Sequence, residues 1–389
     1  MIKKNFLTLT LFAVAVFIGT PANAAEKIRI DRTDSTGVED PIPISLSGFS
    51  GEVLSTLQFD LYVMGFKIVP ENQADFMLSG NNSTRVEGRL KSKVGGSASL
   101  LAKAYSGVSL RMQAHALADD VVKTAAGREG IARTKIAYRV RKGARHFEIY
   151  VSDYDGNAPK AATSDSVIVA APNWVRGRNL LFYSSYKNVF PDIVWHDLTT
   201  GKRQVFANYP GANLSPCVSP DGKKVAMILS RSGSPDLWVC DIDGKNLKQL
   251  TNTREAEASP TWSPDNRTIC FSSEAGGQSA LYTITTAGGA MKKLPGAYGL
   301  CTEPDWSPDG KIIAYTRQSG RNFSIYIVPV NGGTPREVAT GEDPSWAGNS
   351  RNIMLTRDQS HLSVLDVPTK QIKDIARVSG ASTQPTWSR

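Results

Sequence analysis

The chain has 389 residues, enough for two or three domains, and carries a formal net charge of +9 at pH 7. Its basic residues are spread along the sequence and form no stripe with interleaved aromatic residues, which argues against nucleic-acid binding. Beyond the first 24 residues, no segment approaches the roughly eighteen apolar residues of a membrane-spanning helix.

The N-terminus has the pattern of a secretory signal peptide. Two lysines precede an apolar run over residues 6–18, and the small residues Ala22 and Ala24 suit a signal peptidase. The run would rise only about 20 Å as a helix, whereas a hydrocarbon core is about 30 Å thick. We therefore predict that residues 1–24 are cleaved off and that the protein is exported.

Residues 25–128 are predicted to form a small α/β domain after a short N-terminal extension. Alternating apolar residues indicate strands, and two runs with helical spacing, the second ending at Gly127, indicate helices that cover one face of the sheet. The predicted strands are residues 42–46, 66–69, 76–79, 85–92 and 100–108, and the predicted helices are residues 51–64 and 110–126.

Residues 129–389 contain a unit that recurs at nearly constant spacing. Variants of Pro-x-Trp, several followed by Ser-Pro-Asp-Gly, begin at intervals of 44, 44, 44, 40 and 41 residues. A period of about 40–45 residues with four strand-like runs per unit is typical of the WD40-like blades of a β-propeller. The units begin at Pro172, Pro216, Pro260, Pro304, Pro344 and Pro385, which predicts a six-bladed propeller.

Each unit is predicted to form the four strands of one blade. Pro-x-Trp is the innermost strand, and its large Trp is expected to fill the wedge between neighbouring blades. Ser-Pro-Asp-Gly then forms a turn, because Pro presets φ and Asp and Gly suit the following positions. We assign Asp221, Asp265 and Asp309 to this turn geometry and not to acid–base chemistry.

The two ends of the repeat region are offset by one strand. Residues 135–140 form a second-position strand with no Pro-x-Trp strand directly before it, whereas the last Pro-x-Trp strand, residues 385–388, ends the chain. Unpaired strand edges promote aggregation. We therefore predict that these two segments pair and close the ring.

The sequence contains no recognisable catalytic or metal-binding motif. No Gly-x-Ser-x-Gly elbow occurs, and the Asp-x-Asp-Gly segments at residues 153–156 and 241–244 fit hairpin turns better than calcium loops. We predict no catalytic residue, no metal site and no cofactor. The histidines are expected to be structural or surface residues: His115, His146, His196 and His361.

The four cysteines could form two disulfides in an oxidising compartment, or remain as buried thiols. They have no CxxC spacing and fall on non-adjacent strands of the predicted blades. We therefore expect free, buried thiols at Cys217, Cys240, Cys270 and Cys301.

Binding is then the leading class of function, and the loops that precede each Pro-x-Trp strand are the candidate site. These loops surround one mouth of the propeller, and their residues vary between blades while the flanking Pro and Trp repeat. The candidate residues are Asn213, Glu257, Ser259, Thr302, Glu303, Glu342 and Asp343.

The chain resembles the TolB family, the periplasmic component of the Tol-Pal envelope system of Gram-negative bacteria. The resemblance rests on the signal peptide, the small α/β domain, the segment Val151-Ser-Asp-Tyr-Asp-Gly156 and the Pro-x-Trp-Ser-Pro-Asp-Gly repeats that end at Trp387-Ser388. It covers essentially the whole mature chain. It implies a non-enzymatic periplasmic protein, monomeric, that supports outer-membrane integrity and outer-membrane invagination during cell division.

The resemblance also implies two protein partners. A peptidoglycan-associated lipoprotein would dock at the propeller mouth, and it would link the protein peripherally to the outer membrane. The inner-membrane protein TolA would bind the N-terminal extension, here Glu26, Lys27, Ile28, Arg29, Ile30 and Asp31. The alternative is a propeller enzyme or carbohydrate-binding protein of the envelope, for which the mouth offers only a few acids such as Glu257 and Glu303.

Overall fold

The structure is a computed structural model that describes residues 38–93, 99–376 and 378–389. The predicted signal peptide and N-terminal extension lie outside these residues. Among the described residues, no helix is long and apolar enough to span a membrane.

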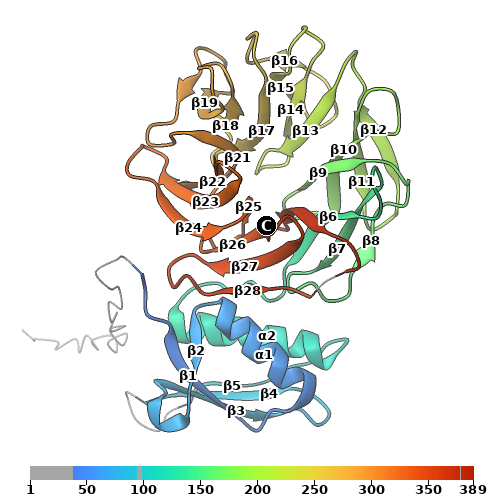
Figure 1. The fold of residues 1–389 in the computed structure, drawn as a ribbon. Helices are drawn as coiled ribbons and strands as arrows, with labels where there is room; N and C mark the ends of the chain where they lie inside the picture. Colours follow the sequence, from blue (N-terminus) through green and yellow to red (C-terminus); the bar gives the residue numbers. More distant parts are fainter. Residues whose placement is uncertain (1–37, 94–98, 377) are drawn as a thin grey trace, which may run out of the picture.

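The N-terminal region is a mixed five-stranded sheet with two helices, as predicted (Figure 1). The strand order is β2-β1-β3-β4-β5; β1 is parallel to both of its neighbours, and the other pairs are antiparallel. The strands are β1 (Ile42–Ser47), β2 (Phe66–Ile68), β3 (Phe76–Asn81), β4 (Glu87–Ser92) and β5 (Ser99–Ala104). The helices are α1 (Gly51–Val63), the short 3₁₀ helix η1 (Glu71–Gln73) and α2 (Leu110–Ala126).

The ends of α2 follow from local sequence. Ser109 caps its N-terminus, where the hydroxyl accepts a hydrogen bond from the Met112 amide at 3.2 Å. Gly127 ends the helix with a left-handed φ of 67°, a conformation that costs glycine little. Both helices lie between the sheet and the propeller, so the polar groups of α1 and α2 reach the second half of the chain (Figure 1).

The remainder folds into six four-stranded blades around a central axis, which confirms the predicted propeller (Figure 1). Blade 2 contains β9 (Val169–Trp174), β10 (Leu180–Ser185), β11 (Asp192–Asp197) and β12 (Arg203–Ala207). Blade 3 contains β13 (Asn213–Val218), β14 (Lys224–Leu229), β15 (Asp236–Asp241) and β16 (Lys248–Gln249). Blade 4 contains β17 (Glu257–Trp262), β18 (Thr268–Ser273), β19 (Ala280–Thr285) and β20 (Lys292–Lys293). Blade 5 contains β21 (Leu300–Trp306), β22 (Ile312–Ser319), β23 (Asn322–Pro329) and β24 (Arg336–Thr340). Blade 6 contains β25 (Glu342–Trp346), β26 (Asn352–Arg357), β27 (His361–Asp366) and β28 (Ile372–Asp374).

Blade 1 combines the two ends of the repeat region, so the predicted ring closure is confirmed. Its strand order is β29-β6-β7-β8, from β29 (Ser382–Trp387), β6 (Lys135–Arg141), β7 (Phe147–Asp153) and β8 (Lys160–Ala161). Thr386 pairs with Ala137 and Trp387 with Ile136. The Lys135 amide also donates a hydrogen bond to Ser388 Oγ at 2.8 Å, so no inner strand edge is left open in this blade.

Packing between blades comes mainly from the inner strands. Five of the six inner strands end in a buried Trp, and Val218 replaces it in blade 3. Five of the hydrophobic clusters each join two neighbouring blades, and the cluster of the N-terminal region also joins blade 6 to blade 1. Every blade is therefore stabilised by burial against the next one.

The Ser-Pro-Asp-Gly turns form as predicted. In blade 3, Asp221 Oδ1 accepts hydrogen bonds from Ser219 Oγ at 2.6 Å and from the Lys223 amide at 3.1 Å. Asp265 and Asp309 make the same two contacts in blades 4 and 5. These carboxylates therefore fix turn geometry.

All four cysteines are free, as expected. Cys240, Cys270 and Cys301 are buried, whereas Cys217 is partly exposed because it lies on the innermost strand of blade 3.

Candidate partner-binding site at the propeller mouth

A channel with a volume of about 240 Å³ runs between the six inner strands. One end of it is lined by the residue that directly precedes each repeated Pro. This residue has a left-handed φ of 48–56° in every blade, and a β-bulge interrupts the pairing of each inner strand beside it. We call these six residues the mouth ring: Ala171, Ser215, Ser259, Glu303, Asp343 and Gln384.

The bulge decides which side chains face the channel. Strand residues two apart normally share a face, but the extra residue of a bulge breaks this alternation. Ser215 and Ser259 line the channel, whereas Asn213 and Glu257, two positions earlier, are only 1% exposed. The expectation that Asn213 and Glu257 lie open at the mouth is therefore wrong.

These two side chains instead hold their own loops in place. Asn213 bonds the backbone of Tyr209 through both its amide oxygen and its amide nitrogen, each at 2.9 Å. Glu257 accepts hydrogen bonds from the hydroxyls of Thr251 and Ser273 at 3.1 and 2.9 Å. The remaining predicted residues, Ser259, Thr302, Glu303, Glu342 and Asp343, are partly exposed and lie in or beside the mouth ring.

Neighbouring members of the mouth ring are joined through side-chain hydrogen bonds. The Asp343 amide donates to Glu303 Oε2 at 3.0 Å, and the Gln384 amide donates to Asp343 Oδ2 at 2.9 Å. The Ala171 amide donates in turn to Gln384 Oε1 at 3.0 Å. Half of the ring therefore carries polar side chains that are fixed by the next blade, and the other half carries the small side chains of Ala171, Ser215 and Ser259.

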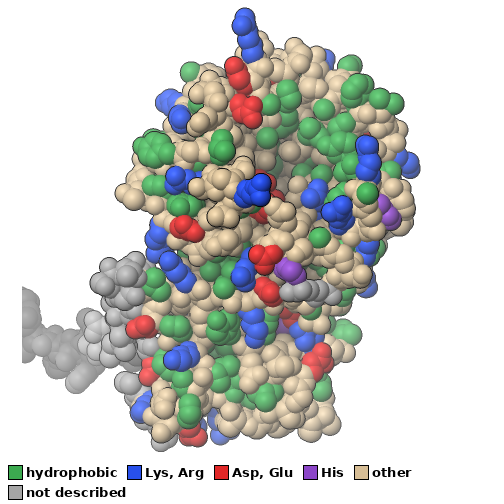
Figure 2. Space-filling view, in the orientation of Figure 1, with side chains coloured by type: hydrophobic (Ala, Val, Ile, Leu, Met, Phe, Trp, Pro, Cys, Tyr) green, Lys and Arg blue, Asp and Glu red, His purple; other side chains and the backbone are tan. Residues whose placement is uncertain are grey.

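The polar half of the mouth is acidic. Burial, reinforced by the nearby Asp343 carboxylate, raises the pKa of Glu303 to about 8, although Thr316 donates a hydrogen bond to it at 2.7 Å. Burial and Asp343 also raise the pKa of Glu342. Arg139 supplies a positive charge near all three acids. Figure 2 shows both acidic and basic side chains near the centre of the propeller.

Deeper in the channel, the side chain between Pro and Trp accepts a hydrogen bond from the next blade in five of the six blades; in blade 3, the Cys217 carbonyl accepts one from the Trp262 indole at 2.9 Å. The Asp305 carboxylate accepts a hydrogen bond from the Trp346 amide at 2.7 Å, and Asn173 accepts one from the Val218 amide at 2.9 Å. Thr261, Ser345 and Thr386 accept the corresponding amide bonds at 3.2, 3.2 and 3.4 Å. Asp305 is the one acid among these central residues, and it forms an ion pair with Arg389.

The face around the mouth also exposes apolar side chains that no sequence pattern predicted. Val189 is 94% exposed, Phe190 58% and Tyr298 63%. Tyr186 lies in the same β10–β11 connection as Val189 and Phe190, and Leu300, the first residue of β21, follows Tyr298. The Tyr186 amide bonds Ile168 O, and Pro191 O accepts from the Asn213 amide, so this loop adjoins the mouth loops. These apolar residues follow no repeat pattern in the sequence. Gln384 of the mouth ring was also not predicted, although its position directly before Pro385 matches that of the other ring residues.

Comparison with known proteins places this architecture among characterised folds. The family model described as the TolB beta propeller domain matches residues 122–389. The Tol-Pal system protein TolB of Gluconobacter oxydans is 29% identical over 244 residues, which cover 55% of this chain and 54% of that protein. TolB of a Polaromonas species is 33% identical over 151 residues, 36% of this chain and 34% of that protein. The alignments thus span about half, or less, of these relatives.

Two solved structures share the fold. The crystal structure of TolB from Acinetobacter baumannii superimposes with a TM-score of 0.80, covering 90% of this chain and 97% of that one at 22% identity. A chain of a nidogen/laminin complex superimposes with a TM-score of 0.55 over 66% of this chain and 98% of that one, at 10% identity. At these identities the likeness is one of fold.

Proposed function

This chain belongs to the TolB propeller family, and on that basis we propose that it is a non-enzymatic periplasmic scaffold of a Tol-Pal system. In this role it binds a peptidoglycan-associated lipoprotein at the propeller mouth and a TolA-like protein through its N-terminal extension. These contacts would support outer-membrane integrity and invagination during division. The two regions, residues 25–128 and 129–389, would each serve one partner.

Exposed apolar side chains around the mouth are the observation that best supports docking of the lipoprotein there. Of the ten large hydrophobic side chains that are exposed in the described part of the chain, five lie at this face, four on loops and one at the start of β21. They form two groups on opposite sides of the mouth, one between β10 and β11 and one between β20 and β21. Exposed apolar side chains on one face favour a protein interaction site, because a partner that covers them removes them from water. The five are Tyr186, Val189, Phe190, Tyr298 and Leu300.

The channel chemistry supports binding over catalysis. Burial raises the pKa of the Cys217 thiol to about 12, so the thiolate that a nucleophile requires is scarce at neutral pH. The Asp305 carboxylate is paired with Arg389, and Glu303 is held by Thr316 and the Asp343 amide. These groups are committed to structure, as they would be in a scaffold.

Titration of a purified lipoprotein domain against single mouth variants tests this proposal. Phe190→Ser and Tyr298→Ser should each weaken binding roughly tenfold, because aromatic anchors dominate interface energies. Val205→Ser is the matched control, since Val205 is 48% exposed on the outer strand β12, away from the mouth. Equal affinity in both mouth variants and the wild type would place the site elsewhere, and specific binding of a glycan to the mouth would favour the carbohydrate-binding alternative.

A second experiment addresses the N-terminal extension. Glu26 to Asp31 alternates charged residues with Ile28 and Ile30, a pattern suited to adding a strand to the sheet edge of a partner or to an edge of the protein's own N-terminal sheet. Removing residues 25–34 should leave the melting temperature unchanged and abolish capture of a TolA-like domain. Full-strength capture by the shortened protein would contradict this assignment.

A further inference from the structure

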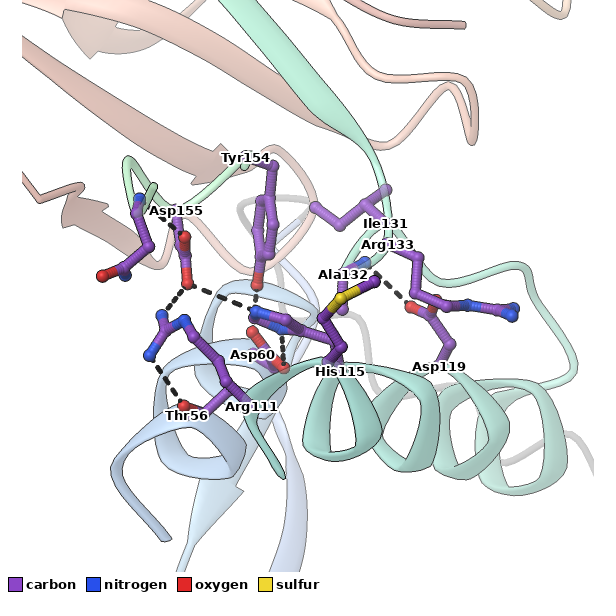
Figure 3. A network of polar contacts seen from close by, with 12 residues as sticks. Thr56, Asp60, Arg111, His115, Asp119, Ile131, Ala132, Arg133, Tyr154 and Asp155 are labelled. Carbon is purple, nitrogen blue, oxygen red and sulfur yellow. Dashed lines mark hydrogen bonds and ion pairs between the residues drawn. The ribbon is translucent and has the colours of Figure 1, made fainter. Parts of the chain in front are cut away.

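A buried polar network joins the N-terminal region to the propeller (Figure 3). Tyr154 and Asp155 belong to the hairpin that follows β7, and they point toward α1 and α2. Tyr154 Oη donates a hydrogen bond to Asp60 Oδ1 at 2.5 Å, and the other oxygen of Asp60 lies 2.8 Å from His115 Nδ1. On its opposite side, His115 Nε2 lies 3.5 Å from Asp155 Oδ2.

His115 is therefore held between two carboxylates that come from different halves of the molecule. Asp60 is fully buried, and His115 and Asp155 are each only 3% exposed, so water does not screen these charges. Arg111 pairs with Asp155 and bonds the Thr56 hydroxyl at 3.0 Å. Two carboxylates face Arg111 and His115, so the network is neutral when Asp60 and His115 share one proton. Burial raises the pKa of Asp60 although His115 donates to it, but a carboxylate on each side of the ring favours His115 as the site of that proton.

Other charged groups around the network do not change this balance. Glu52 reaches Arg111 from α1 at 3.4 Å, but it is largely exposed. Asp119, one turn beyond His115 on α2, accepts hydrogen bonds from the Ala132 amide at 2.8 Å and from Arg133 at 2.9 Å. Asp119 thus has Arg133 as its own partner, whereas Glu52 shares Arg111 with Asp155 and lies in contact with water.

A metal ion is a poorer occupant than a proton. The ligand atoms of Asp60, His115 and Asp155 lie within 4.8 Å of one another, which by distance alone would suit a cation. However, the Asp155 oxygen nearest His115 already contacts the Arg111 guanidinium, and Asp60 accepts the Tyr154 hydroxyl. Positive charge and hydrogen bonds already satisfy both carboxylates.

We propose that a proton on His115 fastens the Tyr154 hairpin of the propeller to α1 and α2, and that this side of the interface loosens when the proton is lost. The other side of the interface is held by contacts that do not involve His115. There, Arg351 bridges Glu39 at 2.9 Å and Asp366, and Asn352 bonds Val63 O at 2.6 Å. Loss of the proton would therefore open the interface at the hairpin while these contacts hold.

The direction of the pH effect follows from the surroundings of His115. Burial alone would lower its pKa, but the hydrogen bond and charge of Asp60, with the charge of Asp155, outweigh burial and raise the pKa. A raised folded-state pKa contributes stability that is complete below the ordinary value of about 6.5 and is lost as pH rises through the folded-state value. The contact between the Tyr154 hairpin and helices α1 and α2 is therefore more stable at acidic pH than at alkaline pH.

Histidine titration by NMR on the full mature protein tests this directly. The His115 ring signal should titrate above pH 6.5 in the wild type, and Asp60→Asn should shift that midpoint downward because it removes the main partner of the imidazolium. Asp119→Asn is the control, since Asp119 lies on the same helix and has the Ala132 amide and Arg133 as its hydrogen-bond partners. A wild-type midpoint at or below 6.5 would overturn the proposal.

The pH dependence of amide hydrogen exchange separates this proposal from a purely structural role of His115, which would leave the exchange rate independent of pH. After correction for intrinsic rates, exchange in the hairpin at residues 153–157 should rise roughly fivefold or more as pH passes the His115 midpoint. The equivalent hairpin of blade 3, residues 241–246, should stay constant. His115→Gln, which cannot be protonated, should exchange fast in the first hairpin at every pH. Hairpin exchange in the wild type that does not change with pH would refute the mechanism. This wild-type measurement remains decisive even if the His115→Gln variant fails to fold.

Discussion

Arg389 and Asp305 form an ion pair inside the propeller channel that links the last residue of the chain to blade 5. Arg389 Nε also donates to Trp346 O at 2.9 Å, and Asp305 accepts the Trp346 amide at 2.7 Å. Three blades therefore meet at one charge pair. Burial raises the pKa of Asp305, and the Arg389 charge opposes this rise.

Replacing Arg389 with Met should lower the free energy of unfolding by about 2 kcal/mol, because the Asp305 carboxylate is left unpaired in the channel. We expect less than the loss for a fully buried pair, since Arg389 is 26% exposed. Chemical denaturation at pH 7 measures the change. The double variant Arg389→Met, Asp305→Asn should recover most of the loss, and a double variant as unstable as the single one would show that charge is not the cause.

Removing residues 383–389 should destabilise the ring severely. The deletion takes most of β29 and the 2% exposed Trp387, whose burial alone is worth about 3–5 kcal/mol. It also exposes the edge of β6, so aggregation on heating is expected. Thermal melting with light scattering measures both effects. Val189→Ser, at a 94% exposed position, should melt like the wild type.

Glu303 should make stability depend on pH between about 4.5 and 8. Its folded-state pKa of about 8 lies above the ordinary value, so its contribution is complete below about 4.5 and lost as pH rises through 8. Glu303→Gln cannot ionise. We expect the variant and the wild type to be equally stable near pH 5, and the variant to be more stable at pH 9 by about 1–3 kcal/mol. A constant difference across this range would contradict the raised pKa.

The cysteines should resist thiol reagents in the native protein. Burial raises the pKa of Cys217 and of Cys240 to about 12 and that of Cys301 to about 11, so almost no thiolate exists at pH 8. A chromogenic disulfide reagent should label far less than one thiol per native chain and all four after denaturation. Rapid native labelling, removed by Cys217→Ser, would show that the channel thiol is accessible.

The sequence by itself determined the propeller. Each Pro-x-Trp strand and each Ser-Pro-Asp-Gly turn forms from residues that are close in sequence. Because the unit recurs six times at a nearly regular period, a ring of blades buries the Trp side chains between neighbours. Even the pairing of β29 with β6 followed from counting strands, because an unpaired inner edge is unfavourable. Local hydrogen bonds around Asp221, Asp265 and Asp309 likewise needed only neighbours in sequence.

The tertiary structure decided which polar residues face one another. Alternation and repeat alignment placed Asn213 and Glu257 at the mouth, but the bulge beside Ser215 and Ser259 turns them into their own loops. The network around His115 joins side chains that are 55 and 94 residues apart, from helices and a hairpin with no shared pattern. Periodicity reports which face of one element is buried, whereas the partner of a buried charge depends on how separate elements pack.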